Sequence, residues 1–112
     1  MLVFIFSMFS EAKVPARYKE CTILNGRVVS CDKELYSGSL VAKDVQEGGL
    51  YRECSFKNGA VVSCQESGWY NGKKVTPDPQ DGYYKSCVIF NGSVHLCNDV
   101  FFSGSLVIPA PF

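Results

Sequence analysis

One fourteen-residue stretch occurs three times along this 112-residue chain and contains all six of its cysteines. It reads YKECTILNGRVVSC from Tyr18 to Cys31, YRECSFKNGAVVSC from Tyr51 to Cys64, and YKSCVIFNGSVHLC from Tyr84 to Cys97. The spacing between successive copies is 33 residues both times. A fixed period of this size is typical of proteins built from repeated supersecondary units.

Each copy predicts a β-hairpin. An Asn-Gly pair stands between two runs of strand-forming residues, and this pair suits a two-residue turn because both positions need positive φ. In that register Ile23 faces Val28 in the first copy, and the same positions are apolar in the other two copies. A recurring apolar pair predicts that this face of the hairpin is turned inward.

The cysteines do not fit a regular two-stranded ladder. Three residues separate Cys21 from the turn, but four separate the turn from Cys31. One extra residue on the returning strand, a β-bulge near Val29 and Ser30, would bring the two cysteines into disulfide range. We therefore expect the bridges Cys21–Cys31, Cys54–Cys64 and Cys87–Cys97. Pairing between copies is the alternative, since six cysteines allow fifteen connectivities.

Cysteine content also constrains the compartment. A 33-residue unit is shorter than the roughly 40 residues below which chains usually need disulfides, metals or partners to fold. Six cysteines in so short a chain favour an oxidising, extracellular location. Zinc is not favoured, because the C-x9-C spacing lacks a close knuckle and His95 is the one histidine. No other metal or cofactor site is predicted.

Charge excludes one class of partner. The formal net charge is zero, and the 11 basic residues are scattered along the chain. Nucleic-acid binding usually requires a basic patch or stripe. The sequence therefore does not predict a nucleic-acid partner.

The N-terminal segment resembles a signal peptide. Residues 1–9 form an apolar run that is too short to span a bilayer. Small residues favour cleavage after Ala12 or Ala16, which would leave Lys13 or Arg17 as the first residue. We expect a leader over residues 1–16 and no membrane attachment after its removal. A buried N-terminal strand is the alternative.

A variable tail follows each hairpin, and its shared element is an aromatic residue, any residue and then glycine. Tyr36 and Gly38, Tyr70 and Gly72, and Phe102 and Gly104 occupy these places. This element predicts a tight turn that leads into a short strand. Because no segment has a helical period, we predict an all-β fold of three tandem disulfide-stapled hairpin repeats, over residues 17–50, 51–83 and 84–112.

The order of a turn-strand element, a loop and a cysteine hairpin resembles fibronectin type I and von Willebrand factor C modules. The resemblance covers 32–64 and 65–97, and it leaves 18–31 as an orphan hairpin. These families carry at least two disulfides in each module, whereas each unit here has cysteines for one. The resemblance implies an extracellular module that binds other proteins.

The sequence offers few candidates for a chemical site. His95 has valines at its place in the other copies, and no Ser/His/Asp or Cys/His arrangement is recognisable, so we predict no enzyme. Trp69 and Tyr70 would stack on a sugar or partner, or else cover the hairpin's inner face. Asn91 begins an N-glycosylation sequon, Asn-Gly-Ser, at the tip of a predicted turn.

Function is predicted as protein binding or self-assembly by a secreted, non-enzymatic repeat protein of matrix, adhesion or filament type. The third unit is the least charged, and an exposed apolar patch usually marks an interface. We expect its interface residues to be Phe101, Phe102, Leu106, Ile108 and Phe112. The same residues would otherwise close the protein's own core. A small secreted effector, such as a toxin or protease inhibitor that presents Thr76 to Pro79, is the alternative function.

Overall fold

The computed structural model describes residues 16–111. The predicted leader, apart from Ala16, and the predicted interface residue Phe112 fall outside this range. Within it the fold is all-β, as predicted, with one short 3-10 turn, η2 (Val45–Glu47), and no α-helix. The nine described strands are β2 (Tyr18–Leu24), β3 (Arg27–Cys31), β4 (Gly38–Asp44), β5 (Leu50–Lys57), β6 (Ala60–Cys64), β7 (Gly72–Pro77), β8 (Tyr84–Phe90), β9 (Ser93–Phe101) and β10 (Gly104–Pro109).

All three predicted hairpins form around their Asn-Gly turns. Asn25 has φ 49° and Gly26 has φ 81°, which is the left-handed pair that this turn requires. Ile23 pairs with Val28, and Cys21 pairs with Cys31, so Val29 is the extra residue of a bulge. Val62 and His95 are the bulged residues of the other two hairpins.

Each hairpin is closed by its own disulfide. The bridges are Cys21–Cys31, Cys54–Cys64 and Cys87–Cys97, and the paired Cα atoms are 3.9 Å apart in each. The bulge explains how cysteines at unequal distances from the turn come to face each other. The predicted register, bulge and connectivity are therefore confirmed.

The sheets cross the borders of the sequence repeats. Each hairpin gains a third antiparallel strand from the tail of the preceding copy, which gives the strand orders β4-β5-β6 and β7-β8-β9. The first hairpin pairs instead with the last described strand, in the order β10-β2-β3. The expectation that 18–31 is an orphan hairpin is therefore wrong.

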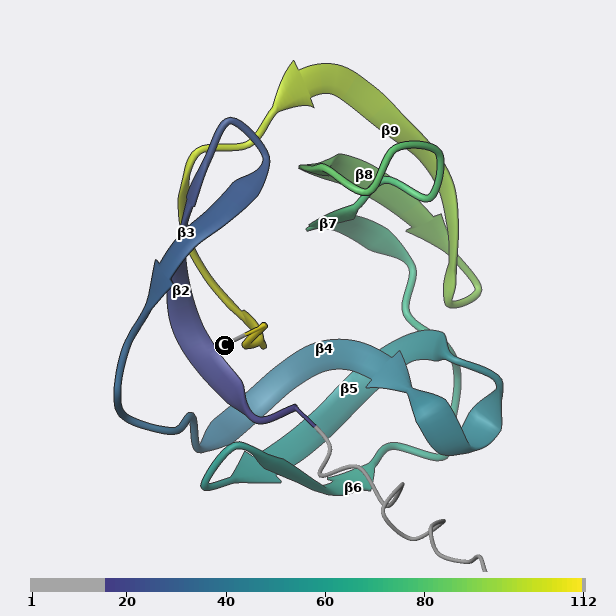
Figure 1. Ribbon diagram of the computed structural model, residues 1–112. Helices are drawn as coiled ribbons and strands as arrows, with labels where there is room; N and C mark the ends of the chain where they lie inside the picture. The colour runs from purple at the N-terminus through teal and green to yellow at the C-terminus, as the bar shows by residue number, and fades with distance from the viewer. Residues whose placement is uncertain (1–15, 112) are drawn as a thin grey trace, which may run out of the picture.

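This last pairing closes the chain into a ring of three sheets (Figure 1). Gly104 pairs with Ile23 at one end of the β10–β2 ladder, and Pro109 pairs with Tyr18 at the other. The backbone N–H of Ala110 also donates to the carbonyl of Arg17 at 2.9 Å. The two ends of the described chain therefore lie side by side.

The same backbone triangle joins neighbouring sheets at all three junctions. At one of them Tyr18 N–H donates to Gly59 O at 2.9 Å, Gly59 N–H donates to Tyr36 O at 2.8 Å, and Tyr36 N–H donates to Tyr18 O at 2.9 Å. The equivalent sets are Tyr51, Gly92 and Tyr70, and Tyr84, Gly26 and Phe102. Each hairpin tip thus docks on the base of the neighbouring hairpin.

The aromatic-x-Gly element is explained by contact between the ring and the glycine. Gly38 has φ 145°, and a Cβ built there would lie 2.8 Å from the hydroxyl of Tyr36. That hydroxyl donates to the carbonyl of Ser39 at 2.8 Å. The short strand predicted after this element is confirmed, because β4 begins at the glycine, whereas residues 35–37 form an irregular connection rather than a turn.

The buried core is small and is divided among the sheets. One cluster joins Cys21, Ile23 and Ile108, and a second joins Ala42, Cys54 and Phe56. In both clusters a disulfide cysteine packs against apolar residues of two strands. The bridges thus form part of the core that each small sheet can bury.

Ring closure predicts that the chain tolerates circular permutation. A permutant that begins at Gly68, ends at Ser67 and joins residue 111 to residue 16 keeps every sheet and every junction intact. Gly68 lies between β6 and β7, and a Cβ added to it would meet nothing within 4 Å. We expect a folded monomer with the three native bridges, as tested by peptide mapping and circular dichroism. Scrambled bridges or an unfolded product would contradict the β10–β2 pairing.

The docked tip predicts a large effect of substituting Gly92. A Cβ there would lie 2.9 Å from Leu50 Cβ and 3.1 Å from the backbone oxygen of Tyr51. Gly68 is the matched control, since its φ of 83° is close to the 82° of Gly92 but its surroundings are open. Both Gly→Ala changes introduce left-handed backbone strain of about 1–2 kcal/mol. Because only the new methyl group at residue 92 meets neighbouring atoms, we expect Gly92→Ala to lower the free energy of unfolding by at least about 1 kcal/mol more than Gly68→Ala does. The free energies of unfolding are measured by chemical denaturation. An equal decrease in the two variants would show that the hairpin tip at Gly92 is not tightly packed.

Candidate functional site

The four residues of the predicted third-unit interface that lie within 16–111 do not form one exposed surface. Ile108 is only 4% exposed, and Phe102 and Leu106 pack beside it on the core of the first sheet. Phe101 is 43% exposed and lies against Tyr83, with 4.9 Å between ring centroids. These residues therefore close the protein's own core, except Phe101, and the prediction of an interface is wrong for Ile108.

Exposed apolar side chains gather instead on another part of the third unit. Val88 pairs with Leu96 across β8 and β9, and their side chains are 39% and 65% exposed. Phe90, two residues along β8, is 62% exposed. We call Val88, Phe90 and Leu96 the apolar face of the third sheet.

The other two sheets are polar at the paired positions. The pair equivalent to Val88 and Leu96 is Thr22 with Ser30 in the first sheet and Ser55 with Ser63 in the second. The residues equivalent to Phe90 are Leu24 and Lys57. The apolar face was not among the sequence-based predictions, although aligning the copies position by position would have revealed it.

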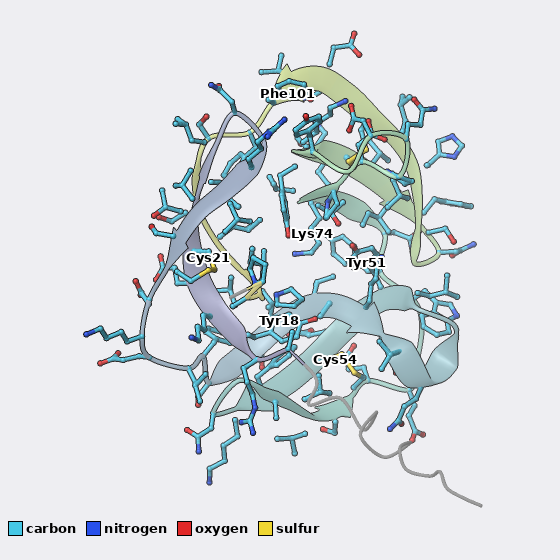
Figure 2. The ribbon with its side chains drawn as sticks, in the orientation of Figure 1. Tyr18, Cys21, Tyr51, Cys54, Lys74 and Phe101 are labelled. Carbon is cyan, nitrogen blue, oxygen red and sulfur yellow. A yellow bond between two sulfur atoms is a disulfide. The ribbon has the colours of Figure 1, made fainter. Side chains whose placement is uncertain are left out.

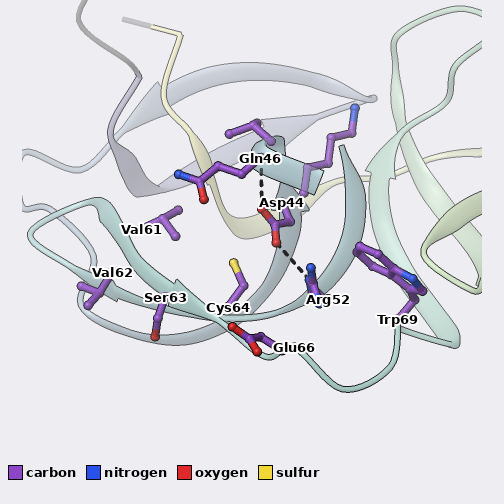
Figure 3. A pocket seen from close by; sticks show the side chains of 11 residues that line it. Asp44, Gln46, Arg52, Val61, Val62, Ser63, Cys64, Glu66 and Trp69 are labelled. Atoms are coloured by element: carbon purple, nitrogen blue, oxygen red, sulfur yellow. Dashed lines mark hydrogen bonds and ion pairs between the residues drawn. The ribbon is translucent and has the colours of Figure 1, made fainter. Parts of the chain in front are cut away.

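A groove of about 750 Å³ lies between the η2 turn and β6 of the second sheet (Figure 3). Val45, Val61 and Val62 line it and are exposed. The bulge in β6 turns Val62 outward, because the extra residue has no partner in the ladder. The groove therefore combines apolar walls with a charged floor.

Arg52 forms that floor. Its Nε lies 2.9 Å from Asp44 Oδ2, and one terminal nitrogen donates to the carbonyl of Gln65 at 2.6 Å. Its guanidinium carbon is 4.0 Å from the ring centre of Trp69. Trp69 thus covers a buried ion pair, which favours the covering role over stacking on a sugar.

The third sheet repeats this arrangement with other residues. Lys85 replaces Arg52, and its Nζ lies 2.9 Å from one oxygen of Asp78 and 2.9 Å from one oxygen of Asp81. Phe101 takes the place of Trp69, 5.3 Å from the ammonium group. The exposed Phe101 is therefore a cover for a buried cation.

Proton affinities follow from these bonds. Hydrogen bonds from the Gln80 backbone and the Lys85 ammonium lower the pKa of Asp78 below its ordinary 3.8. Bonds from Lys85 and the Tyr83 backbone lower the pKa of Asp81. The two carboxylates in turn raise the pKa of Lys85 above 10.5. All three groups are therefore charged near neutral pH.

The other predicted sites are exposed. Asn91 is exposed at its turn, where its backbone N–H donates to Asn71 Oδ1 at 2.8 Å, and its glycosylation stays a prediction. His95 is the exposed, bulged residue of β9. Residues 16–111 contain no group of three or more His, Cys, Asp or Glu side chains that would hold a metal ion. In the same range no helix is long and apolar enough to cross a membrane.

The lowered pKa values of Asp78 and Asp81 predict acid sensitivity. A carboxyl group with a lower pKa in the folded state stabilises that state above its unfolded pKa, and this contribution is lost as the pH falls further. The melting temperature should therefore decrease below about pH 4. The variant Asp78→Asn/Asp81→Asn should have a lower melting temperature at pH 7 than the unaltered protein. Its melting temperature should also fall less as the pH is lowered, as measured by calorimetry. The control Asp32→Asn/Glu34→Gln neutralises two exposed carboxylates and should keep the original profile; identical profiles for both variants would contradict the assignment.

Comparison of the chain with protein-family models, curated proteins and solved structures gave no match. The resemblance to fibronectin type I and von Willebrand factor C modules therefore stays a prediction. Function is accordingly inferred from the surfaces described above.

Proposed function

We propose that the chain is a secreted, non-enzymatic protein that acts by binding another protein through the apolar face of the third sheet. The difference between the three sheets carries this proposal. The first and second sheets fold with Thr and Ser where the third has Val88 and Leu96. Folding therefore does not require apolar side chains there, and an exposed apolar cluster is typical of an interface.

Secretion is supported by the cysteines. All six form disulfides, and none is free. Such bridges persist in oxidising compartments and are reduced in the cytosol. A small core that depends on its bridges suits an extracellular protein.

A partner of a different kind is favoured over a filament of identical chains. Open-ended repeat arrays grow by stacking, but here β10 occupies the edge of β2 that a further unit would use. The outer strands β3, β6 and β9 are bulged, which is one way in which proteins blunt a sheet edge. Assembly by edge pairing therefore has little support, and side-chain contacts through one face have more.

The alternative of a toxin or inhibitor loop has weaker support. Thr76 and Asp78 are buried, and Asp78 is bonded to Lys85. An inhibitory loop would have to present its side chains to a target. Only the two prolines of this segment, Pro77 and Pro79, are exposed.

A triple variant tests the proposal by giving the third sheet the residues of the second. Val88→Ser, Phe90→Lys and Leu96→Ser copy Ser55, Lys57 and Ser63, so the variant should fold and keep its three bridges. We expect it to lose at least about tenfold in binding to extracellular protein surfaces, since hot-spot truncation typically costs about 2 kcal/mol or more. Binding is measured with labelled protein on cell surfaces before and after protease treatment, and sedimentation reports self-association.

A second variant provides the control. Val61→Ser/Val62→Ser removes two exposed apolar side chains from the groove of the second sheet and should bind as the unaltered protein does. A folded triple variant that binds equally well would refute the proposed face. Loss of binding in the control alone would move the site to the groove.

A further inference from the structure

A second cavity of about 140 Å³ lies where the three sheets meet. The inner strands β4, β7 and β10 each contribute to its lining, together with Tyr18, Tyr51 and Tyr84. Figure 2 shows Tyr18, Tyr51 and Lys74 directed toward the middle of the ring. Exposed residues such as Lys43 and Pro109 also line the cavity, so it reaches the protein surface.

The lining is largely apolar and follows the repeat. Val41, Val75 and Val107 occupy the same place on the three inner strands, three residues after the glycine at which each strand begins. An apolar cavity of about 150 Å³ is large enough to hold benzene. The central cavity therefore has room for a small ring or a short aliphatic chain.

One residue that lines this cavity, Lys74, differs from its equivalents in the other two sheets. Leu40 and Leu106 occupy the equivalent positions, opposite a disulfide cysteine in each sheet. Burial lowers the pKa of Lys74 below 10.5, because an ammonium group is poorly solvated there. Placing a half-buried lysine where the other two sheets have leucine costs solvation free energy, unless a group of opposite charge pairs with its ammonium group.

The surroundings of Lys74 supply no counter-charge. The lining contains two lysines, Lys43 and Lys74, and no aspartate or glutamate. The ion pairs formed within residues 16–111 do not include Lys74. An anion that entered the cavity would therefore meet positive charge alone.

The tyrosines add hydrogen-bond donors. Burial raises the pKa of Tyr18, Tyr51 and Tyr84 above 10, so their hydroxyls remain protonated near neutral pH. The hydroxyl of Tyr51 is hydrogen-bonded to Thr76. Tyr18 and Tyr84 also line the cavity.

We propose that the central cavity binds a small organic carboxylate with an apolar body, which pairs its carboxylate with Lys74. The apolar body would lie against the valines and tyrosine rings of the lining. This site is separate from the apolar face of the third sheet and does not depend on the function proposed for that face.

Benzoate is the probe, and benzamide is its neutral counterpart of equal shape. We expect benzoate to bind the complete, disulfide-bonded protein at least tenfold more tightly than benzamide in NMR titrations, with shifts centred on Lys74 and the tyrosines. Equal affinities would overturn the proposal, because the charge would then have no role. Displacement of benzoate by phosphate at equal concentration would also overturn the proposal, since the site would then recognise negative charge alone and not the apolar ring of the ligand.

Two lysine variants locate the charge. Lys74→Leu restores the residue found in the other two sheets and should reduce benzoate affinity at least tenfold. Lys73→Leu removes the same charge from an exposed neighbour and should leave affinity unchanged. Equal effects of the two variants would refute the site. If Lys74→Leu fails to fold, the NMR pKa of Lys74 in the unaltered protein decides: saturating benzoate should raise it, and an unchanged value refutes the proposal.

Discussion

The pairing of β10 with β2 is the interaction on which the rest of this structure depends. Without it the first hairpin would expose one side of β2, and Ile23 would lose its packing against Ile108. The junction between the first and third sheets would also lose support, because Phe102 bonds to both Gly26 and Tyr84 just before β10 begins. Three sheets that each bury only a few apolar residues thereby share one closed arrangement, in which no sheet is terminal.

Much of each hairpin could be predicted because its determinants are local. Asn25 and Gly26 set the turn, the turn sets the Ile23–Val28 register, and the offset of Cys31 requires a bulge. Ring closure could not be predicted in this way, because pairing between a tail and a hairpin leaves no periodic signal in the sequence. Read as a tail alone, the last segment predicts an interface for its apolar residues, whereas in the structure Ile108 completes the first sheet.

Candidate sites emerged where the three copies differ from one another. The shared positions, such as the docked glycines and the disulfides, are explained by folding alone. The positions at which the copies differ are not explained in this way. Val88 and Leu96 replace the Thr and Ser of the first sheet, and Lys74 replaces the Leu of the second. A protein with internal repeats contains its own reference structures, because two sheets show what the third would need for folding. Such departures become visible only when the copies are compared residue by residue, since the repeat itself is established by the positions that agree.

Closure also imposes an order on folding during synthesis. The second sheet is complete once residue 64 has left the ribosome, and the third once residue 101, the end of β9, has done so. The first sheet, although its hairpin is made earliest, must wait for β10, which ends at Pro109. Until then Cys21 and Ile23 lack the strand that covers them, while the hairpin already has both of its cysteines. Early oxidation of Cys21 with Cys31 would hold this waiting hairpin in register and keep its thiols from the cysteines that follow.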